Sequence, residues 1–178
     1  MKFSDNKKLY IRRALFILLT LMTAAFQHTD AAVPDLSGAK AMLLIPLCVC
    51  IAMFEKSMGG LTFGVICGVL WDSVSATGDG FFSITLAAVG FLTGAAITYL
   101  MRRNIFSALI LSAASCLTVN TLYWAVFILL KGYEGAWSVL SGFYLPSALY
   151  SVLFTFIYYY LVRLIVQLTP KDKTIRSV

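Results

Sequence analysis

The sequence predicts an all-α integral membrane protein, folded as one bundle of six transmembrane helices. Apolar residues make up 60% of the 178 residues, only 12% are charged, and the mean hydropathy is +0.87. A soluble domain of this size could not bury so much apolar surface in one core, and a disordered chain would be polar. The apolar residues also fall in separate runs, so lipid is the expected solvent for most of the chain.

Six such runs predict the spans. We expect transmembrane helices at approximately 11–28, 41–54, 58–72, 81–101, 105–130 and 146–166, with Glu55-Lys56 separating the second from the third and Pro46 kinking the second. The first and third spans are short, so they either borrow flanking residues or are surrounded by protein rather than lipid. The first run also has some features of a cleaved signal peptide, although its small-residue exit, Thr23-Ala24-Ala25, is a weak cleavage site.

Charge supports this division of the chain. With the N-terminus inside, twelve of the fourteen Lys and Arg residues lie on the inner side, and only Lys40 and Lys131 lie outside. The net charge of +6 then divides into +9 inside and −3 outside. Basic residues favour cytoplasmic loops, so we expect a multi-pass membrane protein with both termini cytoplasmic.

Several functional classes have little support in these residues. The basic pI is better explained by Lys and Arg in cytoplasmic loops than by nucleic-acid binding. The four cysteines lie in apolar runs without the spacing of metal ligands: Cys48, Cys50, Cys67 and Cys116. His28 has no Cys or Glu at such a spacing, and no nucleophile–base pair or phosphate loop occurs. Apart from Arg163, where the last span leaves the membrane, no span carries a charged residue near its centre, whereas pumps generally need such groups. We therefore expect no catalysis, no cofactor and no metal.

Glycines form the clearest local pattern. Gly60, Gly64 and Gly68 are spaced four apart in the third span, and Gly90 and Gly94 repeat this spacing in the fourth. Glycines at this spacing share one helix face and allow a second helix to approach closely. They therefore predict a tight hairpin of spans three and four, and either packing within this chain or contact with another membrane protein would use such faces.

Two polar residues could have a function or a purely structural role. Asp72, at the outer end of the third span, is either solvated or paired inside the bundle, and a paired acid there would be a candidate functional site. Asn120, in the middle of the fifth span, is more typical of an interhelical hydrogen bond than of a substrate contact.

A family resemblance follows from these motifs. The stretch GGLTFGVICGVLWDSVSATGDGFFSITLAAVGFLTG (59–94) resembles bacterial MreD, the rod shape-determining membrane protein family, as does the closing run LPSALYSVLFTFIYYYLVRL (145–164). The residues that match the family pattern are Gly64, Gly68, Asp72, Gly80, Gly90 and Gly94, with Pro146 and Tyr150 in the last helix.

The resemblance implies a multi-pass protein of the bacterial cytoplasmic (inner) membrane that is a non-catalytic component of the cell-shape and peptidoglycan elongation machinery. It implies MreC as the main partner, with MreB and the elongation glycosyltransferase and transpeptidase as further partners. The alternative is a substrate-binding subunit of an energy-coupling-factor vitamin transporter, a group that also has six hydrophobic helices in fewer than 200 residues and a bundle of similar shape. Such subunits gather polar and aromatic residues near the outer loops, and Asp72, Tyr133, Trp137 and Tyr144 could do so here.

Overall fold

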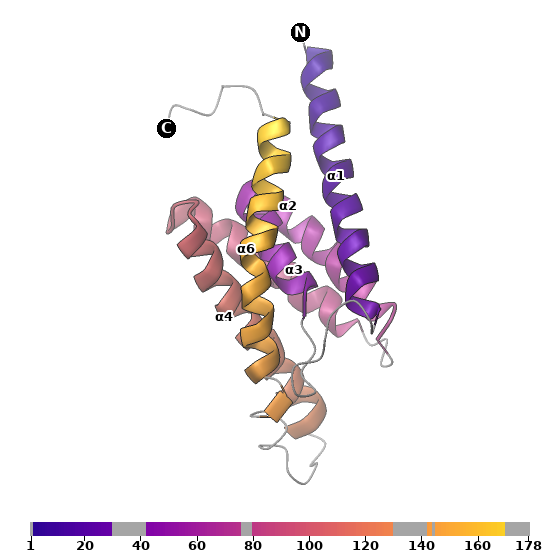
Figure 1. The fold of residues 1–178 in the computed structure, drawn as a ribbon, viewed down its shortest axis with the longest axis vertical. Helices are drawn as coiled ribbons and strands as arrows, with labels where there is room; N and C mark the ends of the chain where they lie inside the picture. The colour runs from indigo at the N-terminus through magenta and orange to yellow at the C-terminus, as the bar shows by residue number, and fades with distance from the viewer. Residues whose placement is uncertain (1, 30–41, 76–79, 130–141, 144, 170–178) are drawn as a thin grey trace.

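The computed structural model describes residues 2–29, 42–75, 80–129, 142–143 and 145–169, and these residues form helices with short connections. The elements are α1 (Lys2–His28), α2 (Leu44–Asp72), α3 (Phe81–Tyr99), α4 (Ile105–Trp124), the π-helical turn η1 (Ala125–Leu129) and α6 (Leu145–Leu168). In Figure 1 the N-terminal end of α1 and the C-terminal end of α6 lie at the same end of the bundle. The expected outer segments around 30–41 and 130–141 fall outside the described residues, as do Tyr133, Trp137 and Tyr144.

Five of these helices are long and apolar enough to cross a membrane, so the predicted count of six is not confirmed. The difference arises at 41–72, where the two expected spans are joined directly at Lys56, without a connecting loop, in the single element α2. The other bounds differ by smaller amounts. α1 extends back to Lys2, α3 ends at Tyr99, and the last turn expected in the fifth span is the π-helical η1.

α2 nevertheless changes direction at Lys56, where two of the expected spans were divided. Lys56 has φ 66° and ψ −177°, which is not a helical conformation. A Cβ atom built on Gly60 would lie 2.8 Å from the Cβ atom of Ala52, whereas residues eight apart in a straight helix are about 12 Å apart. α2 therefore folds back on itself as two short segments, 44–55 and 57–72.

Pro46 does not kink the helix as expected. It is the third residue of α2, in the first turn, where its missing N–H would have had no partner within the helix. The break lies ten residues further on, at Lys56, within the Glu55-Lys56 pair that was expected to separate two spans.

The first segment of α2 is the centre of the molecule. Every residue from Leu44 to Met53 is buried, which is the pattern of a helix surrounded by protein on all sides. In the apolar window of α2, 67% of residues are buried, against 28–33% in the other four spans. α2 contacts α1, α3, α4 and α6, and its largest interface is with α3. This segment, which corresponds to the expected second span, is therefore surrounded by protein rather than lipid.

The outer helices each bury one face and expose the other. On α1 the buried side chains are Arg12, Phe16, Thr20 and Thr23, which follow one another at intervals of three or four residues. On α6 the equivalent face includes Ser147, Ser151, Thr155, Tyr158 and Val162. The opposite faces expose large apolar side chains such as Leu18, Met22, Leu149 and Leu153, as expected of helices that meet lipid.

Candidate functional site

The glycine faces of α2 and α3 pack directly against one another. A Cβ atom on Gly64 would overlap the backbone carbonyl of Leu86, and one on Gly68 would overlap the backbone of Phe82 and Ser83. Gly60 and Gly90 meet each other, so a Cβ on either would overlap the carbonyl oxygen of the other.

Gly94 continues this interface at the fold-back of α2, where a Cβ would lie 2.6 Å from backbone atoms of Lys56 and Ser57. The contacts run antiparallel, since the higher-numbered glycines of α3 meet the lower-numbered residues of α2. The hairpin expected from the glycine spacing is therefore present. All five glycines are used within this chain and do not form a surface for another membrane protein.

Gly80 has a different role from the other glycines in the shared motif. It has φ +70° at the N-cap of α3, and a Cβ atom there would meet nothing within 4 Å. The left-handed conformation, and not a close approach of helices, is therefore the reason for glycine at this position.

Asp72 is paired, and its partners are the first turn of α3. Its Oδ1 accepts a hydrogen bond from the backbone N–H of Phe82 (3.2 Å). Its Oδ2 accepts from the backbone N–H of Ser83 (2.9 Å) and from the Ser83 hydroxyl (2.6 Å). A carboxylate in this place satisfies N–H groups that have no partner within the helix and opposes the positive end of the helix dipole. Asp72 thus caps α3 from the end of α2 and closes the hairpin at the end opposite Lys56.

Aromatic rings pack beside this cap. Trp71 stacks on Phe82 (4.5 Å between ring centroids), Phe82 on Tyr123 (5.4 Å) and Tyr123 on Phe127 (4.7 Å). Phe81 meets three of these rings edge to face. The rings tie the ends of α2 and α4, with η1, to the start of α3, and they pack against one another.

The opposite end of the hairpin holds a buried ion pair between Arg12 on α1 and Glu55 on α2. The Arg12 Nη2 and Glu55 Oε1 atoms are 2.6 Å apart, and their side chains are 3% and 4% exposed. Glu55 directly precedes Lys56, so the ion pair attaches α1 to the fold-back of α2. Charged groups are costly in such a place unless they are paired.

Sequence reasoning missed this pair. It placed Arg12 at the start of the first span and Glu55 between the second and third spans, and it expected no charged residue near the centre of a span apart from Arg163. The available signal was opposite charge at two span ends on the same side of the membrane. The choice of Glu55 rather than another inner-side acid depends on the tertiary fold.

Hydroxyl and amide groups join the remaining helices. The Ser151 hydroxyl accepts from the backbone N–H of Met42 (2.7 Å), and Gln27 Oε1 accepts from that of Leu44 (3.0 Å). α6 and α1 thereby satisfy the start of α2, while Thr155 on α6 donates to Ser112 on α4 (2.8 Å).

The other residues singled out from the sequence lie apart from one another. Asn120 is buried in α4. Pro146 is exposed in the first turn of α6, and Tyr150 is half-buried with its ring against Phe154 (5.4 Å). Among the described residues no group of three or more His, Cys, Asp and Glu side chains could hold a metal ion, and all four cysteines are buried as free thiols.

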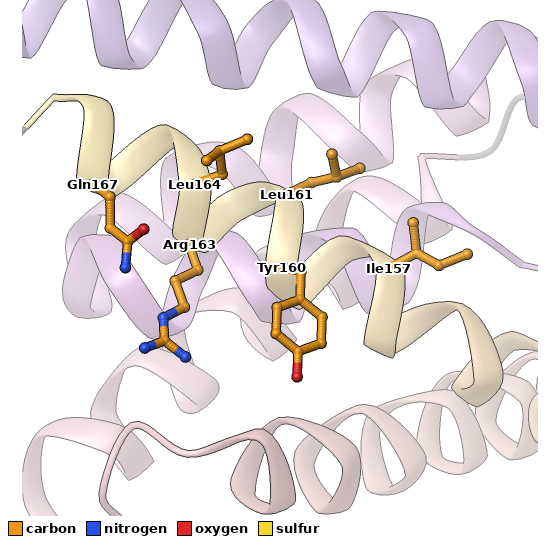
Figure 2. A pocket seen from close by; sticks show the side chains of 6 residues that line it. All are labelled: Ile157, Tyr160, Leu161, Arg163, Leu164 and Gln167. Atoms are coloured by element: carbon orange, nitrogen blue, oxygen red, sulfur yellow. The ribbon is translucent and has the colours of Figure 1, made fainter.

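Two hollows lie along α6 near the end of the bundle that holds the Arg12–Glu55 pair. One, of about 450 Å³, is bounded by α6, the end of the first segment of α2 and the start of α4, and is lined by Phe54, Arg103, Asn104, Ile105, Phe106, Tyr159, Tyr160 and Arg163. The other is an apolar groove along α6, lined by Ile157, Tyr160, Leu161, Arg163, Leu164 and Gln167. Figure 2 shows the Arg163 and Tyr160 side chains pointing to one side of α6, away from Leu161 and Leu164.

The comparisons with known proteins identify no relative. No protein-family model matches this chain, and neither a curated protein nor a solved structure matches it.

Proposed function

We propose that this chain is a non-catalytic membrane component of the bacterial cell-elongation machinery, of the MreD kind, that acts by binding MreC. The observation that carries the proposal is the joint use of the motif residues. Gly64, Gly68, Gly90 and Gly94 make one hairpin interface, and Asp72 closes it. A motif whose members build a scaffold suits a protein that acts by holding others. The partner then meets lipid-facing surfaces rather than the glycines.

A six-crossing topology in the cytoplasmic membrane, with both termini in the cytoplasm, is part of this proposal. Support comes from the fold-back of α2 and from the position of the two helix ends in Figure 1. The position of Arg12 against Glu55 also supports retention of α1 in the mature protein, since its removal would leave a buried carboxylate.

Co-purification tests the proposed partnership. An affinity-tagged copy would be co-expressed with MreC of the same organism and purified in mild detergent at low salt, beside a tagged membrane protein of similar size and unrelated function. We expect MreC to remain with this chain and not with the control. Separation of MreC from a chain that is still folded, as judged by thermal unfolding, would contradict the proposal.

The vitamin-transporter alternative is less well supported, because the rings beside Asp72 stack on each other where a substrate would need open space. Mass spectrometry of the purified protein separates the two functions. A vitamin that stays bound through purification in stoichiometric amount would favour the transporter subunit and overturn the proposed role.

A further inference from the structure

We propose that the cavity bounded by α6, the fold-back of α2 and the start of α4 binds the headgroup of an anionic glycerophospholipid, with one acyl chain along the groove on α6. This inference goes beyond the proposed function, and it holds whether or not the chain binds MreC.

The charge of the cavity indicates the ligand. Arg103 and Arg163 both line it, whereas no acidic side chain does, and within the described part of the chain neither arginine forms a salt bridge. The ion pair described nearby joins Glu55 to Arg12, not to either of these arginines. Two unpaired guanidinium groups from different helices can together bind a phosphodiester, because each offers several N–H donors in a planar fork.

The other lining groups suit a lipid headgroup. Tyr159 and Tyr160 bring an apolar ring and a hydroxyl to the same cavity, as aromatic residues do at membrane interfaces. Asn104 and Ile105 are the cap and first residue of α4, so the positive end of that helix adds to the arginine charge. The volume of about 450 Å³ is within the range of small-molecule sites.

The adjoining groove distinguishes a lipid from a soluble phosphate. It shares Arg163 and Tyr160 with the cavity and continues along α6 past Leu161 and Ile157, which are 39% and 55% exposed. Figure 2 shows Arg163 and Tyr160 on one side of α6 and the aliphatic side chains on another. A charged pocket joined to an apolar groove on a lipid-facing helix matches a molecule with a phosphate head and a hydrocarbon tail.

Native mass spectrometry of the full chain tests the site. The protein in neutral detergent would be titrated with phosphatidylglycerol and with phosphatidylcholine carrying the same dioleoyl chains. We expect phosphatidylglycerol to bind at least tenfold more tightly. Removing one arginine, by Arg103→Gln or Arg163→Gln, should weaken phosphatidylglycerol binding about fivefold, and removing both should weaken it about 25-fold.

Arg13→Gln is the matched control, because Arg13 is exposed on α1 and lines neither hollow. It removes the same charge and should leave lipid binding unchanged, and thermal unfolding of every variant confirms that it is folded. Equal binding of the two lipids, or equal losses in Arg13→Gln and the double variant, would overturn the proposal. Competition by inorganic phosphate as effective as that by phosphatidylglycerol would also overturn it, since the site would then recognise phosphate alone.

Discussion

The two sides of α2 are joined to the rest of the bundle by different chemistry. Toward α3 the closest contacts are backbone against backbone, with Gly60, Gly64 and Gly90 removing the side chains that would hold the helices apart. Toward α1 and α6 the contacts are made by side chains, among them the Arg12–Glu55 pair and the packing of Phe54 against Tyr159.

The difference predicts two responses to mutation. A backbone interface has no atom that can move aside, so an added side chain should disrupt it altogether. A side-chain interface loses one interaction at a time, so its losses should be graded and partly reversible by a second change.

The largest effect is expected from Gly64→Leu. Its Cβ would occupy the position of the Leu86 carbonyl, and a leucine adds three further carbon atoms, so α2 and α3 cannot keep their separation. We expect loss of the folded monomer, measured by size-exclusion chromatography and thermal unfolding in detergent. Even Gly64→Ala should cost about 3 kcal/mol, the upper part of the usual range for overpacking.

Val65→Leu is the control for that experiment. Val65 is the next residue in α2, but 38% of its side chain is exposed, so a larger group can extend outward. It should unfold at the wild-type temperature. If Gly64→Leu were as stable as Val65→Leu, the backbone contact between the two helices would not exist as described.

The second-largest effect tests the side-chain interface. Arg12→Met leaves the buried Glu55 carboxylate without its ion-pair partner and should cost about 3–5 kcal/mol of unfolding free energy. Adding Glu55→Leu should restore most of this loss, because two buried charges are then replaced by apolar groups of similar size. Thermal unfolding of the two single variants and the double variant gives the coupling energy. A double variant as unstable as the sum of the single ones would show that the pair is not coupled.

A smaller loss is expected where the backbone hairpin depends on one side chain. Asp72→Asn keeps one acceptor oxygen in place of two and removes the charge at the start of α3, so it should cost about 1–2 kcal/mol. Ser83→Ala removes only the hydroxyl that donates to Oδ2 and should cost less, about 0.5–1 kcal/mol. Thermal unfolding ranks the two. The reverse ranking would mean that the carboxylate does not cap the backbone of α3.

The local motifs were predictable from the sequence to the extent that they depend on spacing. The glycine repeats identified the α2–α3 hairpin, because residues four apart must share a helix face. Asp72 was recognised as either solvated or paired, and only the fold shows that its partners are N–H groups of α3.

Contacts between distant segments were not predictable in the same way. Spacing within one helix says nothing about which side chain on another helix it will meet, and Arg12 and Glu55 are 43 residues apart. The fold-back at Lys56 was anticipated as a division between spans, but a lysine gives no sign of a left-handed backbone. The two expected spans form the single element α2 because they are joined directly at Lys56, without a separate loop.

The one stabilising change concerns Lys56, the residue that divides α2 into two segments. Lys56 has a backbone conformation that is almost confined to glycine, at a cost of about 1–3 kcal/mol, and its side chain is exposed. Lys56→Gly should relieve this strain. Glycine also has greater chain entropy in the unfolded state, which lowers the free energy of unfolding by about 0.5–1 kcal/mol, so we expect a net increase in the free energy of unfolding of about 1 kcal/mol. This should raise the unfolding temperature by about 2–4 °C.

Lys56→Ala removes the same charge but retains Cβ, so it should give no gain. If alanine stabilised the chain as much as glycine, the lysine side chain would be the source of the strain. The fold-back would then be held by the Arg12–Glu55 pair and the glycine contacts alone, without opposition from its own backbone.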